Sequence, residues 1–553
     1  MPAQLGRLVV PRNRSRQGSQ TIELAFVKLP AIDEAERPPV IYLAGGPGGS
    51  GIEAGRGSRF ELFDALRKTG DVILLDQRGT GRSTLPDPEE CPITRTYPLD
   101  RPIELEPYLE LVEEVGRACR RYWEEHGVDL SAYDTVESVA DLEALRRALG
   151  AERIDLLGIS YGTHLALAYM RHHPDRVRRA VLAGVEGPDH TVKGPEQFDA
   201  QLRRLEELVA NEEPDGLDPL RERIETLLDR LSRQPVTLRI VQVEGRDKET
   251  TLVVGRRGLA ELTMDLLRDP ATMVQVPQLF ERLAGGDFTD VAGTLLGMRT
   301  IGGLQAMPEA MDAASGISRG RLERLRSHDA HSLLGSGLLE ANVALAQGLG
   351  VEDLGTEFRE PVTSDVPTLF ISGSLDGRTP VSNALEVMKG FSEAQHLVVE
   401  NGGHGDDLLV GTPELAAAIV DFFAGRKRTP PRVVLPAPRA SEVPRRIGLS
   451  EEEAARYTGE YERRPREIWR ILHNKTVETL GREGEVLSRN ATLQIRWNGD
   501  GFPFHPTSER NFFIDFPWFL GTEFRFELDA SGAVTHLSVE DGRGDPVRME
   551  KVH

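Results

Sequence analysis

The chain has 553 residues, a formal net charge of −21 and a sequence pI near 5.2. It is too long for a single hydrophobic core, so we expect two to four structural units. Its acidic balance disfavours nucleic acid and anionic lipid as partners, because both require basic patches. The sequence has no apolar run of about 18 residues, which predicts that the chain does not span a membrane.

The first part of the chain alternates between strand patterns and helix patterns. The alternation predicts an α/β fold built on an open sheet, with the first two strands forming an opening pair. We expect strands over Leu5–Pro11, Thr21–Leu29, Val40–Leu43, Asp71–Asp76, Ile154–Gly158 and Val177–Val185.

A glycine-rich loop, Gly45-Gly46-Pro47-Gly48-Gly49-Ser50-Gly51, directly follows the third expected strand. Such a loop leaves backbone N–H groups available to an anion. A phosphate is the less favoured anion, because no Gly-Lys-Ser/Thr follows and Pro47 lacks a donor. The loop can instead hold the oxyanion of an acyl-transfer reaction.

Ser160 lies in the pattern Gly158-Ile159-Ser160-Tyr161-Gly162, between an apolar strand and an amphipathic helix. This pattern predicts a nucleophile elbow, in which a sharp turn exposes the serine hydroxyl and the glycines let strand and helix approach closely. We assign the oxyanion hole to the backbone N–H groups of Gly46 and Tyr161, with Gly45 as the alternative to Gly46.

A serine nucleophile needs a carboxylate and a histidine later in the chain, in that order. Asp376 follows the expected strand Thr368–Ser372, and His404 follows the expected strand Gln395–Glu400. Sites of open α/β sheets lie at the carboxyl ends of strands. Ser160, Asp376 and His404 are therefore the predicted catalytic triad. Asp406 and Asp407 are alternative acids, disfavoured because they lie so close to His404 in the sequence.

The regular alternation stops after Val185. From about Asp189 to Thr356 the pattern is mostly helical, with one strand pair, Val236–Val243 and Glu249–Val254, around the turn Glu244–Asp247. An insertion at this point of the fold predicts a cap over Ser160. The expected division is a core over 1–188 and 357–425 with the cap over 189–356.

The character of the sequence changes again after the helix Pro413–Phe423. Residues 426–447 are rich in proline and basic residues and predict a linker. Residues 448–553 combine a short helix capped by Ser450 with short alternating runs, which predicts a small antiparallel β domain, a barrel or a curled sheet. We interpret its tryptophans, Trp469, Trp497 and Trp518, as core residues rather than a sugar-binding platform.

Three long motifs carry a family resemblance: Ala44–Gly51, Leu75–Ser83 and Gly158–Thr163. Together they resemble the prolyl and tripeptidyl aminopeptidases of the α/β-hydrolase superfamily, over about Leu5 to Gly425. The resemblance implies that the glycine loop supplies the oxyanion hole and that Asp76 and Arg78 have a scaffold role. Prolyl members usually carry a histidine where this chain has Ala44, which favours the tripeptidyl-like branch or an altered specificity.

A separate resemblance concerns the C-terminal unit. Mainly through Tyr457–Tyr461 and Phe524–Val539, it resembles the β domain often appended to bacterial serine hydrolases and β-lactamase-like proteins. Free thiols are the default for two cysteines, but a cysteine pair of the secreted relatives implies a disulfide between Cys91 and Cys119. Met1–Gln4 shows no signal-peptide pattern. The expectation is an exported protein whose leader is absent from this chain, with a cytoplasmic protein as the alternative.

An aminopeptidase must recognise the ammonium group of a free N-terminus, so a carboxylate should line its pocket. Glu186, Glu309 and Asp312 are the candidates. The expected function is release of N-terminal residues or short peptides through an acyl-enzyme. A carboxylesterase is the alternative, because it would use the same triad. A binding scaffold without activity is disfavoured because no triad position is missing, and no cofactor or metal is expected because no His/Cys cluster has metal-ligand spacing.

Overall fold

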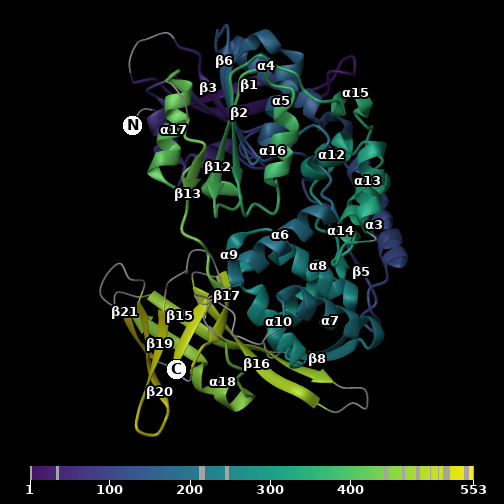
Figure 1. Cartoon of the computed structure of the whole chain (residues 1–553), viewed down its shortest axis with the longest axis vertical. Coiled ribbons are helices and arrows are strands. Elements are labelled where there is room, and N and C mark those ends of the chain that lie inside the picture. Colours follow the sequence, from purple (N-terminus) through teal and green to yellow (C-terminus); the bar gives the residue numbers. More distant parts are fainter. Residues whose placement is uncertain are drawn as a thin grey trace.

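A computed structural model gives the arrangement of the chain (Figure 1). Along its longest axis lie a sheet covered by helices, a mostly helical insertion and an antiparallel β part. The structure describes residues 3–32, 37–210, 218–242, 248–329, 331–426, 429–440, 446–463, 467–480, 486–497, 500–508, 510–514, 523–540 and 547–551.

A nine-stranded sheet forms the centre of the first part, in the order β1-β2-β4-β3-β6-β7-β11-β12-β13. The β1–β2 and β2–β4 pairs are antiparallel, and the neighbours from β4 to β13 are parallel. Strands β3, β4 and β6 are buried at every residue, because helices cover both faces. The strands are β1 Gln4–Pro11, β2 Thr21–Leu29, β3 Val40–Leu43, β4 Val72–Leu75, β6 Ile154–Ile159, β7 Val177–Ala183, β11 Thr368–Gly373, β12 Ala394–Glu400 and β13 Arg432–Val434.

Helices pack on the two faces of this sheet through alternate residues of its strands. On one face, Leu156 and Leu182 share a core with α4, α5 and α16. On the other face, Leu157 and Val181 share a core with α2 and α17. These helices are α2 Phe60–Leu66, α4 Thr135–Ala148, α5 Tyr161–His172, α16 Val381–Met388 and α17 Pro413–Phe423; the short α1 spans Gly51–Ala54 and the long α3 spans Leu105–Glu125.

The insertion between β7 and β11 is mostly helical and has a hydrophobic core of its own. Its helix α14 packs against α3 through a close approach of Gly348 to Gly116, where a Cβ on either residue would crowd the other backbone. Its elements are α6 Pro195–Val209, α7 Leu220–Arg233, β8 Val236–Gln242, β9 Lys248–Val254, α8 Arg256–Leu266, α9 Pro270–Met273, α10 Val276–Ala284, α11 Ala292–Gly297, β10 Thr300–Ile301 (paired with β5, Arg95–Thr96), α12 Ala306–Ser315, α13 Arg319–Asp329, α14 Gly337–Leu349 and α15 Gly355–Arg359. The predicted turn at 244–247 lies outside the described residues.

The C-terminal strands β14 to β21 close into a barrel. Strand β14 pairs with β21 on one side and with β15 on the other. The pairing of β14 with β15 closes the run of strands β14-β21-β20-β19-β18-β17-β16-β15 into a ring. Closure pairs backbone groups that an open edge would expose. The strands are β14 Gly459–Arg463, β15 Glu467–Leu480, β16 Val486–Trp497, β17 Asp500–Pro506, β18 Asn511–Ile514, β19 Glu523–Leu528, β20 Val534–Glu540 and β21 Val547–Lys551.

Aromatic side chains form the barrel core. Tyr457, at the end of helix α18 (Glu451–Tyr457), stacks edge-on against Phe512, and Phe504 packs on the same ring with the ring centroids 4.9 Å apart. Ser450 caps this helix through a capping box with Glu453, as predicted. The side chains of Trp469, Trp497 and Trp518 lie outside the described residues.

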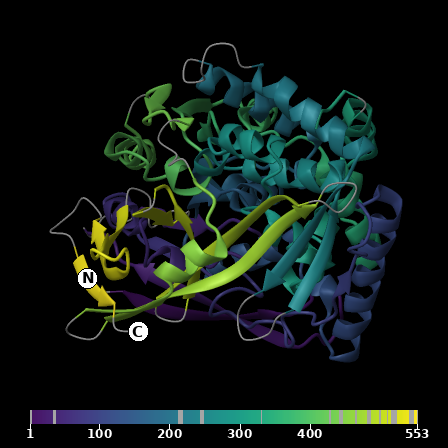
Figure 2. The same cartoon turned by 90° about the horizontal axis from the view of Figure 1, so that it is seen from below.

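Strand β15 reaches out of the barrel and joins the insertion (Figure 2). Its first half pairs with β14, and its second half, Lys475–Leu480, pairs with β8 over Thr237–Gln242. Val477 on this second half is fully buried in the hydrophobic core of the insertion. The barrel therefore completes the core of the insertion, which the separate expectations for the two regions did not anticipate.

A cluster of charges forms a second contact between these parts. The carboxylate of Asp290 in the insertion lies 2.9 Å from the guanidinium of Arg446 and 3.6 Å from the imidazole of His505 on β17. Arg282 of α10 lies 2.8 Å from the same carboxylate. Paired buried charges resist separation, because breaking a pair leaves one charge without its partner.

We expect Val477→Asp to destabilise the chain strongly, because an unpaired carboxylate buried in an apolar core costs about 3–5 kcal/mol. Differential scanning calorimetry measures the effect as a lower unfolding temperature. The matched control is Val9→Asp, since the Val9 side chain is 61% exposed and surface changes usually stay within about 0.5 kcal/mol. Equal shifts in the two variants would contradict the packing of β15 on the insertion.

Part of the expected linker belongs to the first sheet. Residues Arg432–Val434 form β13, which pairs in parallel with β12. Val433 is buried in the core between α17 and the sheet. A three-residue strand among prolines has too short a pattern to be recognised from the sequence, and tertiary packing decides its conformation.

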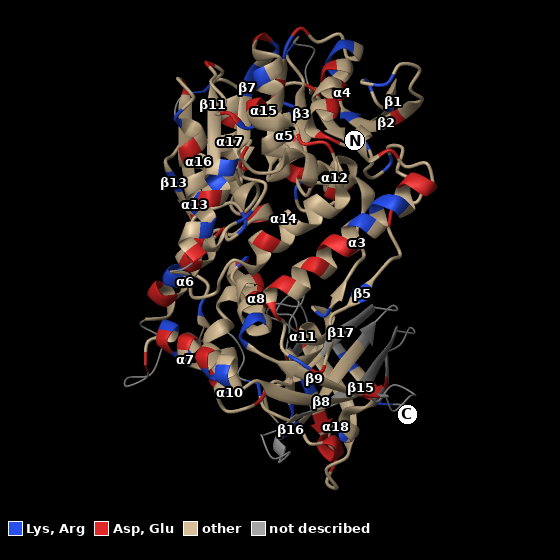
Figure 3. Ribbon diagram, turned by 90° about the vertical axis from the view of Figure 1, so that its right-hand side faces the viewer, with Lys and Arg blue, Asp and Glu red and all other residues tan. Residues whose placement is uncertain are grey.

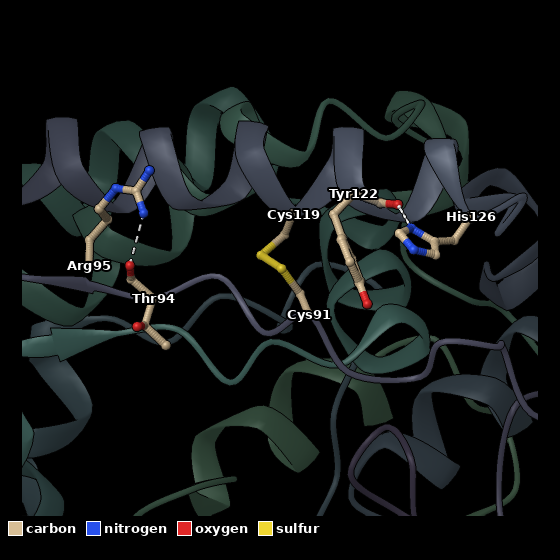
Figure 4. The surroundings of a disulfide bond; sticks show 6 residues. All are labelled: Cys91, Thr94, Arg95, Cys119, Tyr122 and His126. Atoms are coloured by element: carbon tan, nitrogen blue, oxygen red, sulfur yellow. Dashed lines mark hydrogen bonds between the residues drawn. A yellow bond between two sulfur atoms is a disulfide. The ribbon is translucent and has the colours of Figure 1, made fainter.

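Cys91 and Cys119 form a disulfide with their Cα atoms 5.6 Å apart (Figure 4). The bond ties the loop before β5 to helix α3. The same loop is hydrogen-bonded to the start of α12, where the N–H of Ala306 donates to the carbonyl oxygen of Glu89. The disulfide thus braces the segment from which α12 begins.

Acidic and basic residues are interspersed along the helices of the insertion and along α3 (Figure 3). Many form ion pairs one helical turn apart, such as Arg117 with Glu113 and Arg120 with Glu124 on α3. Such alternation is typical of a solvated helix face. Within the described ranges, no helix is both long enough and apolar enough to cross a bilayer.

Candidate active site

Ser160 occupies a strained turn between β6 and α5. Its backbone has φ 54° and ψ −127°, a conformation that a residue with a Cβ rarely adopts. Two glycines make the turn possible. A Cβ on Gly158 would lie 2.6 Å from the carbonyl oxygen of Gly162, and a Cβ on Gly162 would lie 2.0 Å from that of Leu43. The spacing of these residues in the sequence thus reflects a steric requirement of the elbow.

His404 and Asp376 are joined by a hydrogen bond at the carboxyl ends of β12 and β11. The distance from His404 Nδ1 to Asp376 Oδ2 is 2.8 Å. The hydroxyl of Thr379 donates to the same carboxylate oxygen at 2.6 Å, and the N–H groups of Arg378 and Thr379 donate to the other. Burial alone would raise the pKa of Asp376, but the charge of His404 and these hydrogen bonds outweigh it and lower the pKa.

The alternative acids are bound elsewhere. Asp406 pairs with Arg59 at 2.6 Å, and Asp407 accepts the N–H of Gly403 at 2.8 Å. The geometry of the imidazole therefore favours Asp376 as its partner. Thr379 was not singled out in the sequence, although a threonine three residues after an aspartate in a loop is a recognisable turn signal.

Ser160 and His404 line one cavity of about 540 Å³, together with Gly45 and Gly46 of the glycine-rich loop. The cavity lies beneath the insertion, which contributes Phe198, Arg268 and Leu338 to its wall. A volume of this size suits a small ligand or a short peptide.

The glycine-rich loop lies against Ser160. A Cβ on Gly45 would come within 2.8 Å of the Ser160 Cβ, so only glycine allows the approach. Gly49 closes the loop by donating its N–H to the carbonyl oxygen of Gly45 at 3.0 Å. Within the described part of the chain, the N–H groups of Gly46 and Tyr161 have no acceptor. They remain available to a ligand oxygen.

Asp76 and Arg78 stabilise the scaffold around this loop. Asp76 accepts hydrogen bonds from the Ser50 hydroxyl at 2.6 Å and from the Ile52 N–H at 3.0 Å. The buried guanidinium of Arg78 makes a bidentate pair with Asp141. These contacts agree with the scaffold role that the family resemblance implies.

Glu186 faces the cavity but already has a cationic partner. The ammonium of Lys193 lies 2.7 Å from its carboxylate and also donates to the carbonyl oxygen of His190. Burial alone would raise the pKa of Glu186, but Lys193, with smaller contributions from His164 and His190, lowers it. No sequence pattern pointed to Lys193.

Glu309 and Asp312 lie one turn apart on α12, and neither carboxylate has a hydrogen bond or ion pair to the residues that the structure describes. Asp312 lines the main cavity and a second one of about 420 Å³; Glu309 lines only the second. Burial raises the pKa of Glu309 to about 7. The carboxyl of Asp312 is exposed to the cavity. Desolvation by the surrounding protein and the charge of Glu186 raise its pKa well above the usual range, although the charge of Lys193 acts in the opposite direction.

Residues 38–406, about two thirds of the chain, match the alpha/beta hydrolase fold family. The chain therefore belongs to the α/β hydrolases, with helical insertions in the mixed sheet and an additional antiparallel C-terminal sheet.

Three relatives are similar to part of the chain. It is 30% identical over 197 residues to a tripeptidyl aminopeptidase of Streptomyces coelicolor, and 30% identical over 205 residues to the serine protease Hip1 of Mycobacterium tuberculosis. It is 31% identical over 147 residues to a probable proline iminopeptidase of Leptolyngbya boryana. The matches cover 34%, 36% and 27% of this chain and 36%, 38% and 31% of the respective relatives. The chain thus matches only about a third of the length of these relatives.

Proposed function

We propose that the protein is a serine aminopeptidase that releases N-terminal residues or short peptides through an acyl-enzyme. One observation carries this proposal: the cavity that holds Ser160 and His404 is also lined by Asp312, a carboxylate without a partner among the described residues. A carboxylate that has no hydrogen bond or ion pair at the wall of a substrate cavity is suited to the ammonium group of a free N-terminus. The similarity to aminopeptidases supports the same function.

The proposed reaction proceeds in two halves. His404 takes the proton of the Ser160 hydroxyl while Oγ attacks the scissile carbonyl carbon, and the N–H groups of Gly46 and Tyr161 donate to the resulting oxyanion. His404 then gives the proton to the leaving amine, and the C–N bond breaks. In the second half, His404 takes a proton from water while the water oxygen attacks the acyl carbon. The bond from the acyl carbon to Ser160 Oγ then breaks, His404 returns the proton to Oγ, and the acyl product leaves as an acid. Asp376 accepts a hydrogen bond from Nδ1 throughout and stabilises the imidazolium.

We assign the ammonium group to Asp312 and Glu309 rather than to Glu186. Lys193 already neutralises Glu186, so a second cation there would meet a compensated charge. Asp312 and Glu309 occupy successive turns of α12, and Asp312 lies on the wall shared by the two cavities. A peptide whose N-terminus reaches this wall would place its scissile bond near Ser160.

The test compares peptide anilides that have a free N-terminus with their acetylated twins. We expect turnover of the free form and a loss of at least about 100-fold in kcat/KM on acetylation, because acetylation removes the charge that the carboxylates recognise. A panel of aminoacyl, prolyl and tripeptidyl anilides, with short acyl esters beside it, defines the released unit. Equal turnover of both twins, with rapid cleavage of the esters, would favour the carboxylesterase instead.

The preference for a free N-terminus should depend on pH. Below about 7 Glu309 carries a proton and is neutral, so the ratio of kcat/KM for the free anilide to that for its acetylated twin should fall as the pH decreases through about 7. The ratio should fall again above about 8, where a terminal amine loses its charge. His404 acts on both substrates in the same way, so its contribution cancels in the ratio. Glu309→Gln should flatten the acid limb, whereas a constant ratio between pH 5.5 and 7.5 in the unaltered enzyme would refute the role of Glu309.

A further inference from the structure

We propose that Arg59, Arg268 and Arg378 form a cationic leaving-group subsite, which selects substrates that carry a carboxylate just beyond the scissile bond. Such substrates are peptides with an acidic residue, or a free C-terminal carboxylate, directly after the bond that is cut. The inference rests on the proposed acyl transfer to Ser160 and adds a substrate preference to it.

The wall of the main cavity carries more basic than acidic side chains. The chain as a whole carries a net charge of −21, yet among the described residues that line the main cavity four are basic and two are acidic. Lys193 is paired with Glu186 inside the cavity, so it adds no net charge there. The excess of positive charge comes from the three arginines.

Each arginine is oriented by an aspartate that is not among the described residues lining the cavity. Arg59 pairs with Asp406 at 2.6 Å, Arg378 with Asp269 at 2.8 Å, and Arg268 with Asp265 at 3.2 Å. These pairs use Nε of Arg59, Nη2 of Arg378 and Nη1 of Arg268. Arg59 also donates from Nη1 to the hydroxyl of Tyr42. A guanidinium has five N–H donors, so each side chain keeps donors for a ligand in the cavity.

All three arginines lie beside the loops that carry His404 and Asp376. The carbonyl oxygen of Arg268 accepts the N–H of Gly377 at 3.2 Å, and Arg378 is two residues beyond Asp376. The ring of Pro270, next to the segment of Arg268, packs on Gly403, where a Cβ would lie 2.4 Å from Pro270 Cδ. The aspartate that binds Arg59, Asp406, is two residues from His404.

The acidic wall of the cavity lies next to different elements. Pro308 on α12 approaches Gly48 of the glycine-rich loop, and Met311 on α12 contacts the hydroxyl of Tyr161 at 3.1 Å. The cavity is therefore polarised, with carboxylates near the elbow and the oxyanion loop and arginines near the histidine. Because His404 gives its proton to the leaving group, the leaving group must lie on the arginine side. Guanidinium groups recognise carboxylates through paired, charge-assisted hydrogen bonds.

The experiment uses aryl acetates, whose hydrolysis tests the subsite whether or not the enzyme is a peptidase. The substrates are phenyl acetate and 4-carboxyphenyl acetate, and the quantity is the ratio of their kcat/KM values in the full-length enzyme. We expect the double variant Arg268→Gln/Arg378→Gln to lower the ratio of the carboxylate ester to the neutral ester by about 10- to 100-fold, the usual value of one hydrogen bond to a charged group. The matched control is Arg319→Gln, an arginine whose side chain is 91% exposed and which does not line the cavity. It should leave the ratio unchanged.

Two further measurements keep the result interpretable. Raising the salt concentration should lower the same ratio in the unaltered enzyme, which requires no variant to fold. Arg378→Lys, which keeps the charge but loses the planar fork, should retain part of the preference. A fall in kcat/KM that both esters share equally would assign the arginines a structural role and overturn the subsite.

Peptides with a free N-terminus and aspartate, alanine or lysine directly after the scissile bond separate this proposal from the function on which it rests. Cleavage of all three at equal rates, with no ester preference, leaves the aminopeptidase standing and overturns the subsite. A preference for the carboxylate ester without any peptide cleavage would support the subsite and overturn the aminopeptidase. Failure to hydrolyse any ester or peptide would overturn both.

Discussion

Replacing Asp376 by asparagine is expected to lower kcat by about 10³- to 10⁴-fold while the fold is retained. The Asp376 carboxylate accepts the Nδ1 hydrogen of His404 at 2.8 Å, which leaves Nε2 unprotonated and able to accept the serine proton. An amide in its place can donate a hydrogen bond to Nδ1 and so favours the wrong tautomer, and in a comparable triad this change costs about 10⁴ in kcat. Turnover of a free-amine anilide or of a simple ester measures the loss.

The chain offers matched controls for this change. Asp406→Asn and Asp407→Asn alter carboxylates close to the same histidine, but Asp406 is bound to Arg59 and Asp407 to the N–H of Gly403. We expect each to retain kcat within about 10-fold, whereas Ser160→Ala should lose at least as much as Asp376→Asn. A larger loss in Asp407→Asn than in Asp376→Asn would show that the acid of the triad has been misassigned.

The elbow could be predicted from the sequence because its determinants are local. The five residues from Gly158 to Gly162 combine the end of an apolar strand, two glycines and the start of a helix. The two glycines are required because a Cβ at either position would collide with a neighbouring carbonyl oxygen. The loops of Asp376 and His404 were predictable for a related reason, since each directly follows a buried strand and parallel strands end at one edge of the sheet.

Long-range pairings could not be predicted in this way. The contact of β8 with β15 joins segments far apart in the chain, and each strand taken alone reads as part of its own unit. The ion pair of Glu186 with Lys193 joins residues only seven positions apart. It could not be predicted either, because nothing in the loop between them indicates that the two side chains meet. This pair changes the interpretation of the three candidate carboxylates, because it leaves Asp312 and Glu309 as the ones without an ion pair among the described residues.

The placement of charge connects the fold to the proposed selectivity. Helix α12 positions carboxylates on the side of the elbow, and the loop between α8 and α9 positions Arg268 on the side of His404. The start of α12 is held by the loop that the disulfide anchors to α3. The proposed orientation of the substrate therefore depends on insertion elements, of which α12 is braced at its start.

Asp312→Asn should separate recognition from chemistry. The substitution preserves shape and removes the charge proposed to bind the terminal ammonium group, and truncating one partner of a desolvated charge pair costs about 2 kcal/mol or more. We expect kcat/KM for a free-amine anilide to fall by about 30-fold or more and that for the acetylated twin to change little. The control Asp353→Asn removes a carboxylate from the same second cavity that is already bound to Arg359 at 2.6 Å, and it should leave the ratio of the two substrates unchanged.

Stability provides an independent readout of the same variant. The pKa of Asp312 is raised in the folded state, so its ionised form opposes folding at pH values above the unfolded pKa, and the asparagine removes that cost. The unfolding temperature of Asp312→Asn at pH 8 should therefore equal or exceed that of the unaltered chain. A lower kcat/KM for the free-amine anilide together with an equal or higher unfolding temperature is the result expected of a carboxylate that serves binding at the expense of stability. A variant that lost both activity and stability would instead assign Asp312 a structural role and refute its part in recognition.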